Sequence, residues 1–335
     1  MRKKRKTGSM RPAARAPAPQ SRVSDIGTPS AQTLWLLTAL QLRGIGPTTV
    51  RKLADVLSKH PDTRIQDALP EDIARDEPAA RTKAFGILEK CASWSVRIFS
   101  ILDPEYPACL RQIKDAPPII YAKGSISALG KLGCAVVGTR NASDAGLRIA
   151  NRIAGLLARH HLMTISGLAL GIDTAAHSGA LEHNGITVAV LAHGLDTVAP
   201  ASNRKLADQI LANDGALISE HEPGVPPRPP EFVRRNRIQS GLALCSIIVE
   251  SGKLGGAIHQ ARFTREQGRA LFAVLPEFNG TGRDFNSEGG KFLVESLHAI
   301  PLRNSTDLEK YLDNLVRSAA QDSHSAVDAQ LHFQL

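Results

Sequence analysis

The chain of 335 residues has few aromatic residues and few cysteines, and it has no long apolar run. Aromatic side chains make up only 4% of the sequence, so leucine, isoleucine, valine and alanine must fill most of a core that the apolar fraction of 42% can build. No segment approaches the ~18 consecutive apolar residues of a membrane span, and the basic start lacks the apolar stretch of a secretory signal. We therefore expect a cytoplasmic globular protein with no membrane partner. An Arg-rich organellar transit peptide is the alternative for the first residues.

The cysteines are few and widely separated, at Cys91, Cys109, Cys134 and Cys245. None belongs to a C-x-x-C pair, which is the spacing that zinc sites and thiol redox motifs commonly use. The cysteines lie mostly in apolar runs. We therefore expect buried thiols in a reducing compartment.

Positive charge is scarce outside the N-terminus, although the net charge of the chain is +9. Residues 1–30 hold eight Lys or Arg and one acid, which leaves 33 bases against 31 acids in the rest of the sequence. Any anion site in the folded part must therefore come from local clustering. We expect residues 1–30 to be a disordered basic tail, because this segment offers too little apolar surface to fold. It is either a solvated tail or a weak, salt-sensitive contact to phosphate backbones.

Residues 31–95 show a helical pattern with a break at Gly44-Ile45-Gly46-Pro47. The segment LRGIGPTTVRKLADVL resembles a helix-hairpin-helix motif, whose glycines allow the backbone to approach a phosphate and whose second helix aims free N–H groups at it. Such a hairpin also serves as a plain packing unit, so contact with DNA stays open. We predict a small helical domain over residues 31–95.

From residue 97 to residue 302, short apolar runs alternate with helical stretches. This alternation predicts an α/β fold, a Rossmann-like mostly parallel sheet with helices on both faces. The predicted strands are Cys134–Val137, Leu162–Ile165, Thr187–Leu191, Ala216–Ile218, Cys245–Val249 and Ala270–Val274. We expect a helix over residues 289–297 and a C-terminal tail over residues 303–335.

Small and hydroxyl residues follow several of these strands. They are Gly138, Thr139, Arg140 and Ser143, then Ser166 and Gly167, then His193 and Gly194, then Ser219 and Glu220, and finally Glu250 to Lys253. Ligands of open parallel sheets bind at the carboxyl ends of the strands, where helix N-termini favour anions. This pattern predicts a ligand with phosphate groups. The alternative is that the glycines only make tight turns.

The common nucleotide motifs are absent. Residues 138–143 lack the G-x-G-x-x-G spacing, and the second strand ends in Ser166 rather than in an acid for a ribose hydroxyl. Residues 251–254 contain a Gly-Lys pair, but they lack the hydroxyl residue after the lysine and the glycine before the pair that a P-loop requires. Asp173 and His177 are four residues apart, which favours a hydrogen-bonded or capping pair over a metal or acid/base site. We expect no cofactor and no metal.

The densest basic cluster outside the tail is Phe232-Val233-Arg234-Arg235-Asn236-Arg237. An aromatic ring beside guanidinium groups suits single-stranded DNA, which needs neutralised phosphates and a surface for stacking. Arg140 would reach the same place from the first strand of the predicted sheet. The alternative is a solvated helix face, and Arg234 in particular can point to solvent on a helix.

These residues belong to an ordered series of motifs: VGTRNASDAG, ISGLALGIDTAAHSGAL, GITVAVLAHGLDTVAP, ALISEHEPG, FVRRNRIQSGLA and SIIVESGKLGGA. The series resembles the DprA/Smf family across about residues 99–274. The resemblance implies a Rossmann-like domain that binds single-stranded DNA without catalysis, acts as a homodimer and loads the RecA recombinase in natural transformation. It also implies an N-terminal helical domain of sterile-alpha or hairpin type. The DNA-binding residues that it implies are Arg140, Phe232, Arg235, Asn236 and Arg237, with Gly138 and Thr139 in place of the family's Gly-Ser, and Asn203 is a further candidate.

The chain also departs from the family. SGKLGGA replaces two hydroxyl residues of the family motif and adds Lys253, and too few residues follow the α/β domain for a winged-helix domain. A divergent relative in phage defence or a toxin-antitoxin system is therefore an alternative. The rival class is a nucleotide-binding or nucleotide-cleaving enzyme in which Glu220 or Glu250 assists cleavage of an N-glycosidic bond, but the Pro-Gly-Gly-x-Gly-Thr loop of such hydrolases is missing.

Overall fold

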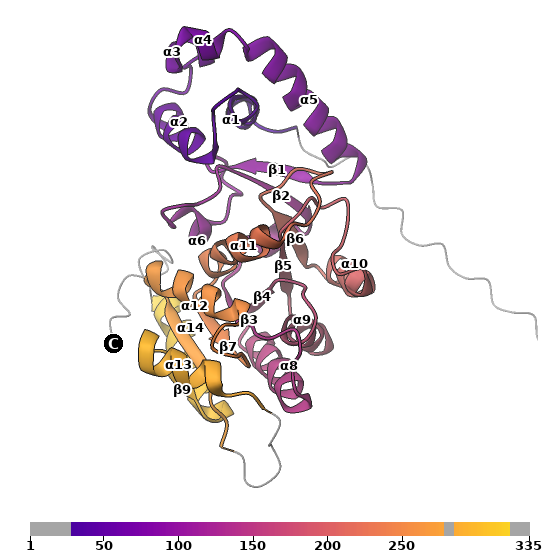
Figure 1. Cartoon of the computed structure of the whole chain (residues 1–335), viewed down its shortest axis with the longest axis vertical. Coiled ribbons are helices and arrows are strands. Elements are labelled where there is room, and N and C mark those ends of the chain that lie inside the picture. The colour runs from indigo at the N-terminus through magenta and orange to yellow at the C-terminus, as the bar shows by residue number, and fades with distance from the viewer. Residues whose placement is uncertain (1–27, 278–284, 322–335) are drawn as a thin grey trace, which may run out of the picture.

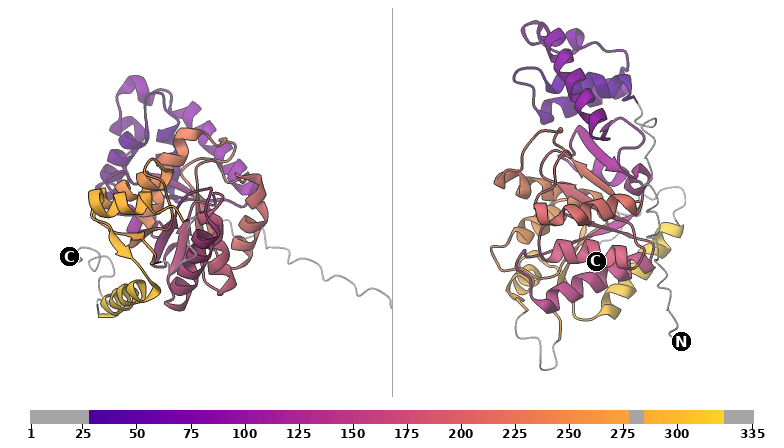
Figure 2. Two further views of the ribbon diagram at one scale, coloured as in Figure 1. Left: turned by 60° about the horizontal axis from the view of Figure 1, so that its bottom comes forward. Right: turned by 90° about the vertical axis from the view of Figure 1, so that its right-hand side faces the viewer.

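The computed structural model describes residues 28–277 and 285–321. A single sheet lies at its centre, with helices on both faces and a helical unit at one end (Figures 1 and 2). The strands are β1 (Arg97–Ser100), β2 (Ile119–Gly124), β3 (Gly133–Val137), β4 (Met163–Ser166), β5 (Thr187–Leu191), β6 (Ala216–Ser219), β7 (Cys245–Ile248), β8 (Ala270–Val274) and β9 (Ile300–Leu302).

The α-helices include five in the N-terminal unit and nine in or after the sheet domain. Those of the N-terminal unit are α1 (Ala31–Leu40), α2 (Pro47–Lys59), α3 (Ile65–Ala68), α4 (Glu71–Ala74) and α5 (Glu77–Ser93). The others are α6 (Ala108–Arg111), α7 (Ile126–Leu129), α8 (Asp144–Arg159), α9 (Ile172–Glu182), α10 (Arg204–Ala212), α11 (Pro229–Leu242), α12 (Gly256–Glu266), α13 (Glu288–Leu297) and α14 (Ser305–Gln321).

Seven neighbouring strands of the sheet are parallel, in the order β6-β5-β4-β3-β7-β8-β9. At one edge, β2 joins β6 in the antiparallel direction and β1 joins β2. The mostly parallel sheet predicted from the sequence is therefore confirmed. The six predicted strands correspond to β3 through β8, and their bounds differ by at most one residue.

Alternate residues of the strands face opposite layers, as the two-residue repeat of a strand requires. Val136 and Ile247 pack in one apolar cluster with α8, whereas Val137 and Ile248 pack in another with α12 and α13. The strands between α8 and α12 are thus apolar on both faces, which explains their uninterrupted Val and Ile runs. The predicted helices on both faces are confirmed.

The N-terminal unit packs directly on the antiparallel edge of the sheet. Apolar residues of α1, α2 and α5 form one continuous core with β1 and β2. A buried hydrogen-bonded cluster also joins them, since Ser30 and Thr33 donate to the carboxylate of Asp103 at 2.7 and 2.5 Å. The helix, turn and helix predicted around Gly44 are present, and Gly44 has a φ of +80°, which a glycine adopts readily.

Regular structure continues beyond residue 302, where a tail was expected. Helix α14 packs Leu308 and Leu312 into the cluster that α8 shares with the sheet. The apolar side chains of its first turns recur with the spacing of a helix, which explains why this segment folds. The expectations for residues 1–27 and 322–335 lie outside the described residues. No helix in the described part of the chain has both the length and the apolar character of a membrane span.

Candidate nucleic-acid interface

The switch point of the doubly wound sheet lies between β3 and β7. Strand β4 continues on one side of β3, and β7 lies on the other side. Ligands of such sheets bind outside the carboxyl ends of the strands at this point. The loops at residues 138–143 and 249–255 meet here, and the N–H of Thr139 donates to the carbonyl oxygen of Glu250 at 2.7 Å. The predicted residues Gly138 to Arg140, Ser143 and Lys253 therefore belong to two adjoining loops.

Glu250 fills the position where a nucleotide phosphate would be expected. Its side chain is buried, and its Oε2 accepts hydrogen bonds of 3.0 Å from both the N–H and the hydroxyl of Ser143, the N-cap of α8. A Cβ atom at Gly146 would lie only 2.0 Å from the same oxygen. The N-terminus of a helix attracts anions, and here the protein supplies its own carboxylate. Glu250 is therefore a structural group at the switch point.

Arg140 and Phe232 pair at the surface of the switch point. The guanidinium carbon of Arg140 lies over the ring of Phe232, 5.2 Å from its centroid. Arg140 is exposed and Phe232 is half-buried, so both remain accessible. The contact joins the loop after β3 to α11 and puts a fixed positive charge beside an aromatic surface. The pairing predicted from the sequence is therefore present.

Arg235 is buried beneath this pair rather than exposed beside it. Its guanidinium donates to the carbonyl oxygens of Gly167, at 3.1 Å, and of Val190. A Cβ atom at Gly167 would lie 2.3 Å from Nη1 of Arg235, so only glycine leaves room for the guanidinium. Burial lowers the pKa of Arg235 to about 10, although Asp173 opposes the shift. Arg235 remains a cation that holds α11 against the ends of β4 and β5.

Asp173 and His177 complete the buried surroundings of Arg235. The Asp173 carboxylate accepts hydrogen bonds from the N–H groups of Gly167, at 3.1 Å, and of Ala169, at 3.3 Å. Burial raises the pKa of Asp173, and Arg235 opposes that rise. Nδ1 of His177 lies 2.7 Å from the Thr187 hydroxyl, and burial lowers the pKa of this imidazole to about 3. The expected pairing of Asp173 with His177 is therefore wrong, because each side chain bonds to other groups.

Arg237 and Asn236 also connect α11 to neighbouring elements. Nη2 of Arg237 lies 2.5 Å from Oε2 of Glu220, and its Nε lies 3.3 Å from Oδ2 of Asp115. The Arg237 side chain is only 6% exposed, so it cannot contact a phosphate directly in this arrangement. The Asn236 amide donates to the carbonyl oxygen of Gly256 at 3.4 Å. These two side chains fix the position of α11.

Two further candidates have internal roles. The Ser166 hydroxyl donates to the carbonyl oxygen of Val136 at 2.7 Å. The Asn203 amide donates to the carbonyl oxygen of Leu168 and to the Thr174 hydroxyl, both at 2.9 Å. Both side chains are buried; Ser166 joins β4 to β3, and Asn203 stabilises the loop that follows β4. The predicted residues that remain accessible are Gly138, Thr139, Arg140, Ser143, Phe232 and Lys253.

The sequence interpretation gave no site role to Arg234, whose side chain is 48% exposed and two residues from Phe232. It is the one arginine of the 234–237 cluster that reaches the surface, whereas Arg235 and Arg237 face inward. No sequence signal separates these three arginines, because the orientation of α11 depends on Gly167, Val190 and Glu220, which lie far away in the chain.

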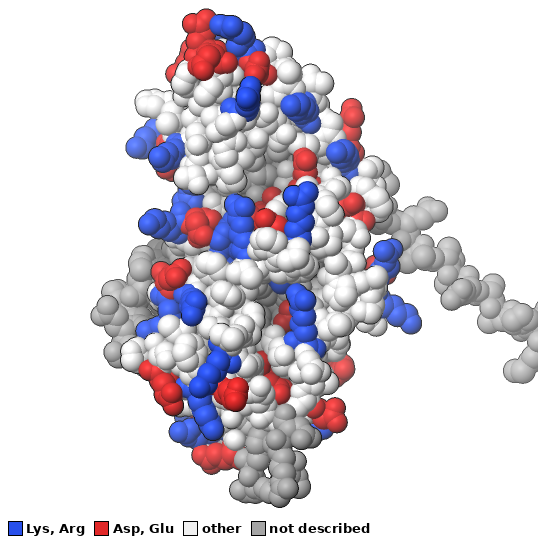
Figure 3. Space-filling model, viewed as in Figure 1, with Lys and Arg blue, Asp and Glu red and all other residues white. Residues whose placement is uncertain are grey.

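Charges of both signs are mixed over the face drawn in Figure 3, which agrees with the near balance of acids and bases after residue 30. A positive site on this protein is therefore a local arrangement of side chains. The pair of Arg140 and Phe232 is such an arrangement.

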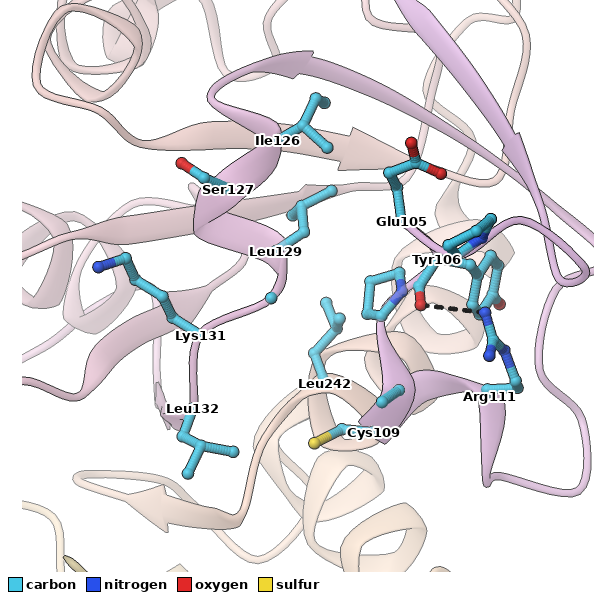
Figure 4. Close-up of a pocket in the computed structure, with 14 residues that line it drawn as sticks. Glu105, Tyr106, Cys109, Arg111, Ile126, Ser127, Leu129, Lys131, Leu132 and Leu242 are labelled. Carbon is cyan, nitrogen blue, oxygen red and sulfur yellow. Dashed lines mark hydrogen bonds between the residues drawn. The ribbon is translucent and has the colours of Figure 1, made fainter. Parts of the chain in front are cut away.

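A separate pocket of about 400 Å³ opens at the opposite edge of the sheet, near the amino end of β3. Leu129 and Leu132 lie across it from Tyr106 and Arg111, and Arg111 donates to the carbonyl oxygen of Tyr106 at 3.3 Å (Figure 4). Its lining is mostly apolar. It lies near the amino end of β3, whereas the switch point lies at the carboxyl ends of the strands, so the two places are distinct.

The sheet order and the paired Arg140 and Phe232 define a Rossmann-like α/β protein whose accessible switch point presents a cation and an aromatic ring. The family model of DNA recombination-mediator protein A matches residues 97–313. The chain therefore belongs to the DprA/Smf family. The matched region begins at β1 and ends within α14, so it includes the whole sheet.

Individual relatives agree with this family. Protein Smf of Synechocystis is 31% identical over 317 residues, which cover 84% of this chain and 77% of that protein. DNA processing protein DprA of Streptococcus pneumoniae is 40% identical over 59% of this chain and 68% of its own length. The match to Protein Smf of Escherichia coli, at 39% identity, spans only about half of that protein.

Solved structures of the family share the fold. DprA of Streptococcus pneumoniae superposes with a TM-score of 0.68 at 29% identity, over 84% of this chain and 98% of the solved chain. DNA processing protein A of Helicobacter pylori has a TM-score of 0.55 at 24% identity, over 68% of this chain and 96% of the solved chain.

Proposed function

We propose that this chain binds single-stranded DNA at the switch point, where Arg140 contacts a phosphate and Phe232 stacks on an unpaired base. The observation that carries this proposal is the contact of 5.2 Å between the Arg140 guanidinium and the Phe232 ring. Single strands are bound by positive groups that follow the backbone and by aromatic rings that accept bases of any sequence. The Helicobacter pylori relative has a single-stranded DNA binding mode, which supports the same ligand class here.

Exposed cations near the pair extend the proposed path of the strand. Arg234 lies two residues after Phe232 in α11, and Lys253 lies in the loop after β7. Both side chains are exposed, so each can neutralise a phosphate, although Arg234 also lies 3.9 Å from the buried carboxylate of Glu220. Arg235, Asn236 and Arg237 act in this proposal as positioning residues, because their side chains hold α11 and are buried.

We also propose that the chain has no nucleotide-cleaving activity of its own. Glu250, the strongest candidate for a catalytic acid or base, is buried and receives hydrogen bonds from Ser143 and from the N–H of Asn286, at 2.9 Å. Glu220 is held by Arg237. A carboxylate engaged in this way has little freedom to transfer a proton to a substrate. Both glutamates therefore support a structural role.

The experiment is a fluorescence anisotropy titration of the full chain with a labelled single strand and with a duplex of equal length. The proposal predicts tighter binding of the single strand, because only unpaired bases can reach the Phe232 ring. Equal or tighter binding of the duplex would overturn it. Incubation with nucleoside monophosphates tests the second proposal, and release of free base would contradict it.

We further propose that the protein delivers bound DNA to a RecA-type recombinase during transformation, and that it acts as a homodimer. Membership in the family of DNA recombination-mediator protein A supports this role. The test is the rate at which RecA forms filaments on single strands that are already coated by single-strand-binding protein. The chain should accelerate this step, and no acceleration would contradict the role. Light scattering should report the mass of two chains, and a monomer mass would contradict the dimer.

A further inference from the structure

Three side chains with metal-binding chemistry converge beside the first turn of α11. Glu220 and His221 directly follow β6, and Glu231 belongs to α11, so the chain returns to this place after a loop. One possible ligand atom of each residue lies within 4.8 Å of the ligand atoms of the other two. This group of three residues is called here the α11 cluster.

Each of the three side chains also carries a buried polar atom that, among the described residues, lacks a hydrogen-bond partner. Within the described part of the chain, Oε1 of Glu220, Nε2 of His221 and Oε2 of Glu231 are buried and have no hydrogen-bond partner. The Glu220 side chain is only 8% exposed, and Nε of Arg234, 3.9 Å from its Oε1, is beyond hydrogen-bond distance. Buried polar atoms in folded proteins are normally satisfied. Three unsatisfied atoms on side chains that converge therefore indicate a missing common partner.

A divalent cation satisfies all three atoms. Carboxylate oxygens and a neutral imidazole nitrogen are lone-pair donors, and this mixed set suits first-row transition ions better than Mg²⁺, which prefers oxygen alone. Zinc binds such atoms at about 2.0 to 2.2 Å, so two ligands of a tetrahedral ion lie roughly 3.3 Å apart. Nε2 of His221 and Oε2 of Glu231 already lie 3.2 Å apart.

The local charge also favours a cation. Arg237 occupies the second oxygen of Glu220 at 2.5 Å and is itself shared with Asp115, while Nε of Arg234 lies 3.9 Å from Oε1 of Glu220. The three carboxylates are those of Glu220, Asp115 and Glu231, and the two guanidinium groups are those of Arg234 and Arg237. The cluster therefore retains one unbalanced negative charge when the imidazole is neutral.

We propose that Glu220, His221 and Glu231 bind one divalent transition-metal ion. The ion joins the end of β6 to the first turn of α11, the segment that carries Phe232. It acts as a structural clamp on α11, and its binding requires neither DNA nor any activity of the protein. The spacing of these residues in the sequence, with nine residues between His221 and Glu231, explains why no metal motif is visible there.

The test is calorimetric titration of the full, chelator-treated chain with Zn²⁺, with Mg²⁺ as a comparison ion. The wild type should bind one Zn²⁺ at this site and bind Mg²⁺ much more weakly. H221Q and E231Q should each weaken this Zn²⁺ site by roughly 10-fold or more, since even partners outside a coordination shell change metal affinity by about 10- to 100-fold. Zn²⁺ should also raise the Tm of the wild type and leave the Tm of both variants nearly unchanged.

H160Q is the matched control, because His160 resembles His221 without a third ligand. Nδ1 of His160 lies 3.6 Å from Asp313, and its side chain is 20% exposed, against 18% for His221. This variant should bind Zn²⁺ as the wild type does. Equal Zn²⁺ affinity in the wild type, H221Q and E231Q would overturn the proposal and leave His221 and Glu231 as an ordinary ion pair. The Tm of each metal-free variant verifies folding, and the two variants alter different elements of the fold.

Discussion

The Glu250 carboxylate binds Ser143 twice, through the N–H and through the hydroxyl, each at 3.0 Å. These two residues lie 107 positions apart, one after β7 and the other before α8. The contact closes the helix N-terminus at which related folds bind a phosphate. It therefore explains why a Rossmann-like sheet here leaves only its outer rim, with Arg140 and Phe232, for a ligand.

E250Q should destabilise the protein without creating or removing a catalytic activity. The amide nitrogen of Gln cannot accept a hydrogen bond, so a donor that the Glu250 carboxylate now satisfies would lose its acceptor. Hydrogen bonds to charged groups contribute about 1.5 to 3 kcal/mol each. We expect the free energy of unfolding, measured with denaturant, to fall by about 2 to 3 kcal/mol. E309Q is the control, since Glu309 makes only an exposed ion pair with Arg159 and should change stability by less than about 1 kcal/mol. Unchanged stability of E250Q would contradict this role.

R235A should act through stability. The substitution removes the donor of two buried carbonyl oxygens and leaves Asp173 without its nearest cation. Leaving a buried hydrogen-bond acceptor unsatisfied costs about 1 to 3 kcal/mol, so urea unfolding should show a loss of at least about 2 kcal/mol. R234A, one residue away and exposed, should leave the unfolding midpoint almost unchanged. If R235A were as stable as R234A, Arg235 would not hold α11 in the way described.

His177 should make the stability of the protein depend on pH. Burial lowers its pKa from 6.5 to about 3, so between these values the unfolded chain binds a proton that the native protein does not. The stability that His177 contributes is complete above about pH 6.5 and decreases by up to about 1.4 kcal/mol per pH unit as the pH falls below that value.

H177N tests this dependence, because asparagine can still reach the Thr187 hydroxyl but does not titrate. Denaturant unfolding at pH 5.0, 5.5, 6.0 and 7.0 should show a smaller loss of stability on acidification for H177N than for the wild type. Burial raises the pKa of Asp173, which is present in both proteins, so the difference between them isolates the imidazole. Parallel pH profiles would show that His177 is not buried as a neutral group.

The central strands could be predicted from the sequence because their residues are apolar on both faces. A run such as Thr187–Leu191 that alternates with helical stretches is typical of a strand covered by helices on both faces. Strand β9 and helix α14 were not predicted. The three residues Ile300–Leu302 are too few to show a repeat, and the polar residues that follow Val316 dominate the composition of the last segment.

The sequence could predict the part of the candidate site that depends only on the order of the strands and on the loops that follow them. The rule that ligands bind at strand ends brought together the loops of Arg140 and Lys253. The sequence does not reveal which face of α11 packs on the sheet, and so Arg235 and Arg237 could not be separated from Arg234. Their burial depends on tertiary partners, namely Gly167, Val190 and Glu220, and a local pattern contains no information on such partners.

F232A should weaken binding of single-stranded DNA without changing its response to salt. Loss of a base stacked on an aromatic ring costs about 1 to 3 kcal/mol, whereas no charge is removed. Anisotropy titrations at several salt concentrations should therefore give a line parallel to that of the wild type, displaced to weaker binding. Phe232 is half-buried, so the Tm of the variant must be measured as well. A folded F232A with wild-type affinity would exclude stacking on this ring.

The most direct measurement of the central claim is the salt dependence of single-strand binding by R140A. If Arg140 contacts one phosphate, the variant should bind all sequences more weakly, and the slope of log Kobs against log salt should become shallower by about 0.7 to 1. R265A is the control, because Arg265 is an exposed residue near the end of α12. This control should keep the wild-type slope and affinity. If R265A weakened binding as much as R140A, or if R140A kept the wild-type slope, the protein would bind DNA through diffuse charge and the switch point would not be its DNA site.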